Sequence, residues 1–263
     1  MPLLQNIEEF QNVSPALQWA IFIVACLIAI VAVISVCISI WLSIKYVTYN
    51  RRTNSANLSG KDAARKILDK NGLQHIKVSV VGSMMFGNSY SHYFKKVRLR
   101  RMTTKKPSIT SLAMGAEKSA LAILDKENDP DMRARVALTP LMYFGPLAFI
   151  PLVLIGVLID LFVFNFSGVA TTIALALGLG IYVISFVLSV KTLKTEKKAQ
   201  ERACKILGDE GMATDEEIGM MKELFKLYNI QYINDIVMEL LQLILKVLQI
   251  VAKLQQSSAS DNG

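Results

Sequence analysis

The stretch SITSLAMGAEKSALAIL, residues 108–124, decides how the rest of this sequence is interpreted. Small and apolar residues recur along one side of it at helical spacing, which predicts a helix over residues 108–124. Glu117 and Lys118 are the only charged residues within it. The acidic, proline-containing segment Asp125–Asp131 follows and is expected to end the helix. We expect the remainder of the chain to be organised around this helix.

Long apolar runs lie on both sides of this helix. The chain is 263 residues long and 52% hydrophobic, which is too apolar for an ordinary soluble domain. Leu17–Trp41 contains 25 residues without a charge, long enough to cross a hydrocarbon core of about 30 Å. Val136–Ile159 and Val169–Val190 are two further runs of this kind. The sequence therefore predicts a mainly α-helical membrane protein with an N-terminal anchor helix and a later transmembrane hairpin.

The charge distribution predicts the orientation of these spans. Residues 45–135 carry 19 basic and 7 acidic side chains, and basic residues also follow the third apolar run. Because basic residues collect on the cytoplasmic side, the main polar region is expected to be cytoplasmic. The N-terminus and the hairpin turn near Asn165–Gly168 are then outside. We predict a multi-pass protein of the cell membrane.

The polar region between the first two spans has the pattern of a small α+β unit. Helical spacing begins at Lys61 and stops at Asn71-Gly72. Alternating residues predict strands at Ile76–Val80 and Lys96–Arg100, which we expect to pair antiparallel. Ser89-Tyr90-Ser91 is assigned to the loop between them.

The C-terminal part of the chain is predicted to be helical. A charged helix follows the third span, and another begins at Thr214. The last predicted helix covers Ile230–Leu254, and its polar residues lie in one narrow stripe while the rest of its surface is apolar. Such a helix lies in the membrane interface, packs into the bundle or joins a partner. These three alternatives stay open.

Several segments of the sequence resemble one known family, the neutral zinc metallopeptidases of bacterial membranes of the YugP type. The resemblance extends over about residues 59–245. The segments that carry it are Ser59–Leu73, Val97–Leu99, Arg135–Pro140, Phe144-Gly145, and Glu196 with Ala199 and Arg202-Ala203.

The resemblance implies a zinc site with a His-Glu-x-x-His helix. Two imidazoles at positions i and i+4 grip the metal, the adjacent Glu activates its water, and a Glu from a later helix is the third ligand. Placed along this pattern, Glu117 stands at the first His, Lys118 at the catalytic Glu, Leu121 at the second His and Glu196 at the ligand Glu. Only the last matches. Leucine cannot bind zinc, and a protonated lysine cannot act as a base.

Together with the resemblance, the patterns give an ordered set of segments. These are an extracytoplasmic N-terminus (1–16), a transmembrane anchor (17–44), a basic cytoplasmic zincin-like region (45–135), a transmembrane hairpin (136–190), cytoplasmic helices (191–229), an apolar helix with a polar stripe (230–255) and a disordered tail (256–263).

Two groups of charged residues have a functional and an ordinary interpretation. Glu117, Lys118 and Glu196 either form ion pairs in place of a metal or point into water on charged helices. A basic run is interpreted as a contact for anionic lipid headgroups, against a simple solvated face. It lacks the aromatic residues and the module of a nucleic-acid site, and no nucleic acid is expected. Its members are Lys95, Lys96, Arg98, Arg100, Arg101, Lys105 and Lys106.

We interpret the chain as a zinc-metallopeptidase-like membrane protein that has lost its zinc ligands and catalytic base. Such a pseudopeptidase acts by binding or regulating a protein. No cofactor is expected, although the family would bind zinc. The expected partners are membrane lipids and either a protein substrate or an active relative. Two alternatives remain: an active metallopeptidase with an unconventional metal site, and a non-enzymatic, lipid-interacting membrane protein.

Overall fold

A computed structural model describes residues 13–81, 87–163 and 168–260, without side-chain detail at 138, 140–150, 182 and 254–260. The chain divides into two compact units. One comprises residues 38–143 and 187–232, and the other the described parts of 1–37, 144–186 and 233–263. The elements are α2 (Pro15–Arg51), α3 (Gly60–Lys70), β1 (Lys77–Val81), β2 (Ser89–Ser91), β3 (Lys96–Arg100), α4 (Arg101–Lys105), α5 (Ile109–Lys126), α6 (Pro130–Phe162), α7 (Val169–Asp209) and α8 (Asp215–Ser260).

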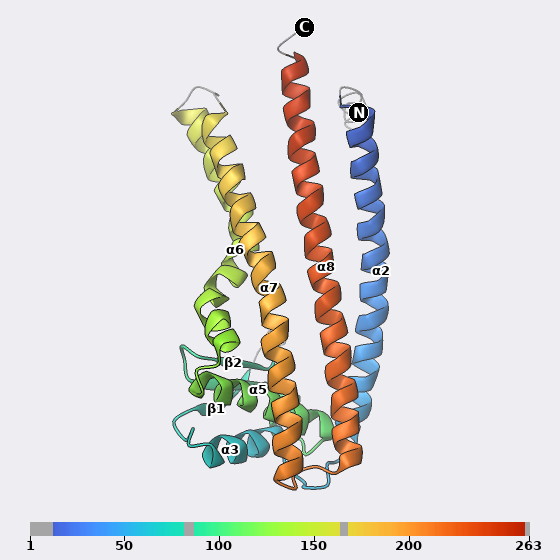
Figure 1. Ribbon diagram of the computed structural model, residues 1–263, viewed down its shortest axis with the longest axis vertical. Helices are drawn as coiled ribbons and strands as arrows, with labels where there is room; N and C mark the ends of the chain where they lie inside the picture. Colours follow the sequence, from blue (N-terminus) through green and yellow to red (C-terminus); the bar gives the residue numbers. More distant parts are fainter. Residues whose placement is uncertain (1–12, 82–86, 164–167, 261–263) are drawn as a thin grey trace. The chain divides into compact units, whose positions relative to one another are not determined.

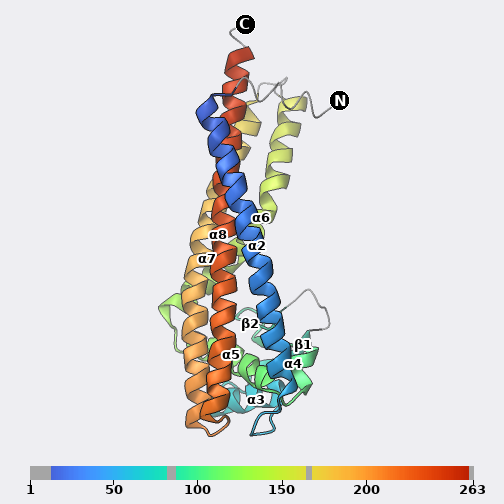
Figure 2. The ribbon, with the colours of Figure 1, turned by 90° about the vertical axis from the view of Figure 1, so that its right-hand side faces the viewer.

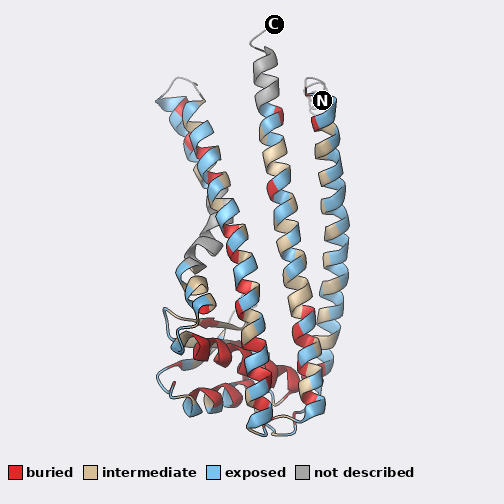
Figure 3. Cartoon of the chain, viewed as in Figure 1, coloured by how far each residue is buried: buried red, intermediate tan, exposed pale blue. Residues whose placement is uncertain are grey.

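Helix α5 is the centre of the first unit, and it confirms the helix predicted over 108–124. The side chain of Ser108 caps its N-terminus by accepting a hydrogen bond from the backbone of Ser111. Every residue from Ile109 to Leu124 is buried, including Glu117 and Lys118. Figure 3 shows α5 as a continuous buried segment. Residues of α3, the sheet, α7 and α8 form one hydrophobic cluster with it.

Helix α3 crosses α5 at very short range because two glycines meet there. A Cβ atom on Gly60 would lie 2.8 Å from the carbonyl oxygen of Ser111. A Cβ on Gly115 would overlap the carbonyl oxygen of Gly60. Ser59 caps the start of α3, and Gly72, with φ of +67°, follows its end. Figures 1 and 2 show α3 beside α5 in both views.

The small sheet differs from the one predicted. Strands β1 and β3 pair in parallel, with Val78 opposite Val97, so the expected antiparallel pair is wrong. Ser89–Ser91, assigned to a loop, forms strand β2 and pairs antiparallel with β3. The strand order is β1-β3-β2. Because the hairpin partner β2 takes one edge of β3, β1 can pair only with the other edge, and the crossover makes that pairing parallel.

The second unit consists of helical segments with exposed apolar side chains. Close approach of α6 and α7 depends on Gly156, where a Cβ would lie 2.7 Å from the Cβ of Ala174. The carboxylate of Asp160 accepts hydrogen bonds from the backbone N–H groups of Ala170 and Thr171 at 3.0 and 2.7 Å. This acid therefore caps the N-terminus of α7.

Two helices, α2 and α7, are long and apolar enough to cross a membrane, and Pro151–Phe162 is a shorter apolar helical stretch in the described chain. They contain the first and third predicted runs. The second run, Val136–Ile159, includes residues whose side chains are not described. The N-terminal segment 1–16 and the predicted turn near 165–168 lie mostly outside the described residues.

The C-terminal helices are continuous where the sequence suggested separate segments. Helix α8 extends from Asp215 to Ser260, so it joins the predicted helices and includes most of the expected tail. Thr214 and Glu217 form a reciprocal capping box at its start, with N···O distances of 2.9 and 3.3 Å.

Gly115→Ala should lower the free energy of unfolding by about 1–3 kcal/mol, because the added methyl group overpacks the α3–α5 crossing. Gly219→Ala is the matched control, since a Cβ there meets nothing within 4 Å and alanine favours a helix. Chemical unfolding of the detergent-purified variants measures both. Equal stability of the two variants would contradict the close crossing.

Candidate functional site

Lys118 lies between two carboxylates inside the first unit. Its ammonium nitrogen is 3.0 Å from an oxygen of Glu117 and 3.1 Å from an oxygen of Glu196. Glu117 and Lys118 come from α5, and Glu196 comes from α7. The three side chains are 6%, 11% and 17% exposed. Of the two arrangements considered for these residues, the structure has the ion pairs, and they are shielded from water.

Further polar side chains extend this group into a network. Arg135, near the start of α6, donates a hydrogen bond of 2.6 Å to the second oxygen of Glu196. The amide of Gln200 donates to Glu117 at 3.1 Å and accepts from Asn229 of α8 at 2.8 Å. The two carboxylates, of Glu117 and Glu196, therefore face two cationic side chains, Lys118 and Arg135. Opposite charges in equal number are what a buried ionic group needs to offset its desolvation.

The pKa shifts follow from burial and from these neighbours. Burial raises the pKa of Glu117 above its ordinary value of 4.5, and the Lys118 charge opposes this only in part. Burial alone would lower the pKa of Lys118, but the charges of Glu117 and Glu196 outweigh it, and the pKa lies above 10.5. Burial would raise the pKa of Glu196, yet Lys118 and Arg135 bring it below 4.5. Lys118 is accordingly a cation at neutral pH.

A cavity of about 260 Å³ lies against this network. Its lining includes Asn88, Arg100, Glu117, Lys118, Glu196 and Gln200. All of these residues belong to the first unit. The cavity therefore gives a small polar ligand access to both carboxylates.

The side chains at this site do not fit a zinc ion. The ammonium of Lys118, which brings a positive charge and no lone pair, stands between the carboxylates. Leu121 is fully buried in the core and has no donor atom. In the part of the chain that the structure describes, no three His, Cys, Asp or Glu side chains are grouped so as to hold a metal.

The predicted basic run is divided among several places. Lys95 lies in the turn before β3 and faces Asp125. Lys96, Arg98 and Arg100 alternate along β3 with the buried Val97 and Leu99, so they share the other face. Three remaining members are exposed, in α4 or just after it: Arg101, Lys105 and Lys106.

Three members of the network, Arg135, Gln200 and Asn229, were not found from the sequence as site residues. Arg135 was noted only as the first residue of Arg135–Pro140, one of the segments that carry the family resemblance. Gln200 lies one turn after Glu196 on the same face of α7. That spacing was the available signal, because a side chain at i+4 from a buried acid meets the same neighbours.

The fold and the site define a mostly helical protein with a small three-stranded sheet and a buried ionic group beneath a cavity. A family model described as "Putative neutral zinc metallopeptidase" matches residues 23–251. The chain belongs to this family. No curated protein and no solved structure matches it.

Lys118→Met should lower the free energy of unfolding by about 3–5 kcal/mol, because it leaves two buried carboxylates without their shared cation. Lys197→Met removes the same charge from an exposed position of α7 and should change stability by less than about 0.5 kcal/mol. Urea unfolding at neutral pH compares them. Similar small losses in both variants would mean that the ion pairs contribute little.

Proposed function

We propose that this chain is a pseudopeptidase, a member of the zinc metallopeptidase family that works by binding and not by hydrolysis. The observation that carries the proposal is the ammonium of Lys118 between Glu117 and Glu196. In this proposal, Glu117, Lys118 and Leu121 stand where the family's zinc helix has its first His, its Glu and its second His. Glu196 stands at the third ligand.

The chemistry of these side chains supports the loss of catalysis. Hydrolysis by this family's mechanism needs a metal-bound water and a carboxylate base beside it. A lysine that stays protonated at neutral pH can neither accept the proton of that water nor ligate the metal. It supplies instead a fixed positive charge, which replaces part of the metal's electrostatic role in holding Glu196.

The binding role is supported by what remains at the site. The cavity beside the network is lined by amide, guanidinium and carboxylate groups, which hydrogen-bond to polar ligands such as a peptide segment. A protein substrate that is held without cleavage, or an active relative that is regulated, is the partner that we propose.

The same proposal includes placement in the cell membrane with several spans. The exposed apolar lengths of α2 and α7 support it, as does the excess of basic residues in 45–135, which favours a cytoplasmic position for the first unit. The exposed basic side chains Arg101, Lys105 and Lys106 are then proposed contacts for anionic lipid headgroups. Nucleic acid is not a proposed partner.

After loading with zinc and desalting, the detergent-purified chain should retain no stoichiometric zinc by elemental analysis, because Lys118 excludes a second cation from the site. Glu196→Ala is the control and should give the same result. Near-stoichiometric zinc in the natural sequence that disappears in Glu196→Ala would refute the proposal. A triple variant with Glu117→His, Lys118→Glu and Leu121→His should gain zinc if the assigned positions are right.

A single cysteine introduced as Lys61→Cys, at an exposed position of α3, tests the orientation. A membrane-impermeant maleimide should leave it unlabelled in intact cells and label it after permeabilisation, since the first unit is proposed to be cytoplasmic. The chain without this substitution provides the background from its own cysteines. Labelling in intact cells would show that the first unit lies outside the cell and would contradict the proposed orientation.

A further inference from the structure

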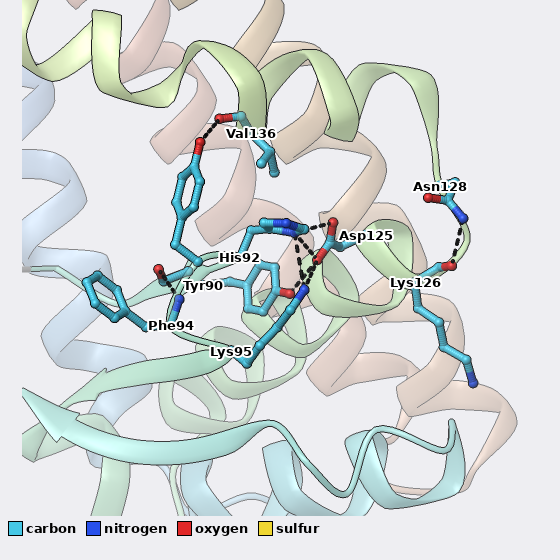
Figure 4. A network of polar contacts seen from close by, with 10 residues as sticks. Tyr90, His92, Phe94, Lys95, Asp125, Lys126, Asn128 and Val136 are labelled. Carbon is cyan, nitrogen blue, oxygen red and sulfur yellow. Dashed lines mark hydrogen bonds and ion pairs between the residues drawn. The ribbon is translucent and has the colours of Figure 1, made fainter.

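A second and larger cavity, of about 450 Å³, lies in the first unit at the junction of α5 and α6. None of its lining residues lines the cavity beside Lys118. Both histidines of the chain line it, together with Lys95, Lys126 and Arg133. Figure 4 shows the polar contacts beside it, where side chains from the β2–β3 hairpin meet the end of α5.

The one carboxylate of this cavity is already fully engaged. Asp125 accepts hydrogen bonds from the hydroxyl of Tyr90 at 2.6 Å and from Nδ1 of His92 at 2.7 Å. The ammonium of Lys95 lies 3.5 Å from the same carboxylate. Burial would raise the pKa of Asp125, but the hydrogen bonds from Tyr90 and His92 bring it below its ordinary value. A ligand in the cavity therefore meets a carboxylate whose charge is balanced.

The other acids of the α5–α6 turn are matched elsewhere. Glu127 pairs with Arg202 at 2.9 Å. Asp129 and Asp131 lie 3.0 and 3.2 Å from lysines of α7, at positions 198 and 194. These pairs account for every acid between residues 125 and 131.

Two cations of the cavity, Arg133 and Lys126, are consequently left without a carboxylate. Within the described residues, the side chain of Arg133 makes no hydrogen bond or ion pair. Lys126 donates only to the backbone oxygen of Asn71. The cavity thus carries an excess of positive charge that the protein itself does not balance.

The rest of the wall is apolar and leads into α6. It includes Leu73, Ile76, Ala122, Val136 and Ala137. Val136 and Ala137 are also the first residues of the second long apolar run. The cavity therefore combines a cationic side with an apolar side, and its volume exceeds what one small anion would fill.

We propose that this cavity binds a phosphate monoester, an anion whose phosphate carries one organic substituent. Arg133 and Lys126 supply the charge, and a guanidinium matches two phosphate oxygens at once. Since Asp125 holds His92 through Nδ1, Nε2 is the ring nitrogen that is left for a ligand. The substituent lies along the apolar wall. A phospholipid headgroup and a water-soluble phosphate ester share this chemistry, and the test separates them.

Isothermal titration calorimetry of the full-length chain in non-ionic detergent uses three probes: glycerol 3-phosphate, dioctanoyl phosphatidic acid and dioctanoyl phosphatidylcholine. Binding of glycerol 3-phosphate, with or without binding of phosphatidic acid, would support a site for water-soluble phosphate esters. Binding of phosphatidic acid alone would support a lipid ligand. No binding of either, or equal binding of phosphatidylcholine, would overturn the proposal.

Arg133→Gln and Lys126→Gln should each weaken binding about tenfold, as expected for the loss of a charged hydrogen bond. Lys61→Gln and Lys197→Gln remove the same charge from exposed positions outside the cavity and should leave the affinity unchanged. Equal weakening in all four variants would assign the binding to net charge and refute the site. Thermal unfolding without ligand checks that each variant is folded.

Discussion

The ammonium of Lys118 is the constraint on which the first unit depends. A lysine in the middle of a buried helix carries a large desolvation cost, and only carboxylates at hydrogen-bond distance offset it. Glu117 is supplied by the same helix, while Glu196 has to be brought by α7 from 78 residues further along the chain. The ion pairs therefore fix both the rotation of α5 and the position of α7 against it.

Helix α7 holds this arrangement through two rows of side chains. Glu196 and Gln200 reach the charged residues of α5. Lys194, Lys198 and Arg202, spaced four residues apart, reach the acids that follow α5. One stretch of about two turns thus ties α5 to the start of α6. The exposed pairs of the second row contribute little energy each, but they set the register of the helix.

Local patterns in the sequence were enough to predict the helices that surround the site. Ser59, Asn71 and Gly72 delimit α3, and Ser108 begins α5, because caps act on neighbouring backbone groups. Two of the three strands were predicted, but their pairing was not, since pairing depends on which edge of β3 another segment occupies. Ser89–Ser91 is too short for alternation to distinguish it from a loop.

The two cavities differ in how far the sequence could indicate them. Family resemblance pointed to Glu117 and Lys118 because the motif has a fixed spacing on one helix, and to Glu196 because the family takes its third ligand from a later helix. Nothing comparable pointed to His92 and Asp125, which lie 33 residues apart and meet only through the β2–β3 hairpin.

The unpaired cations of the second cavity can be identified only after every nearby acid has been matched with its partner. Lysines and arginines at a helix junction usually face solvent or pair with a nearby acid, and the turn after α5 contains several acids. The structure pairs each of those acids with Lys95, Lys194, Lys198 or Arg202. Arg133 and Lys126 are what remains, and they stand at the edge of an apolar wall. Both side chains are exposed to water, so their charge is solvated and available to an anion, and the apolar wall beside them favours an amphiphilic anion as the ligand.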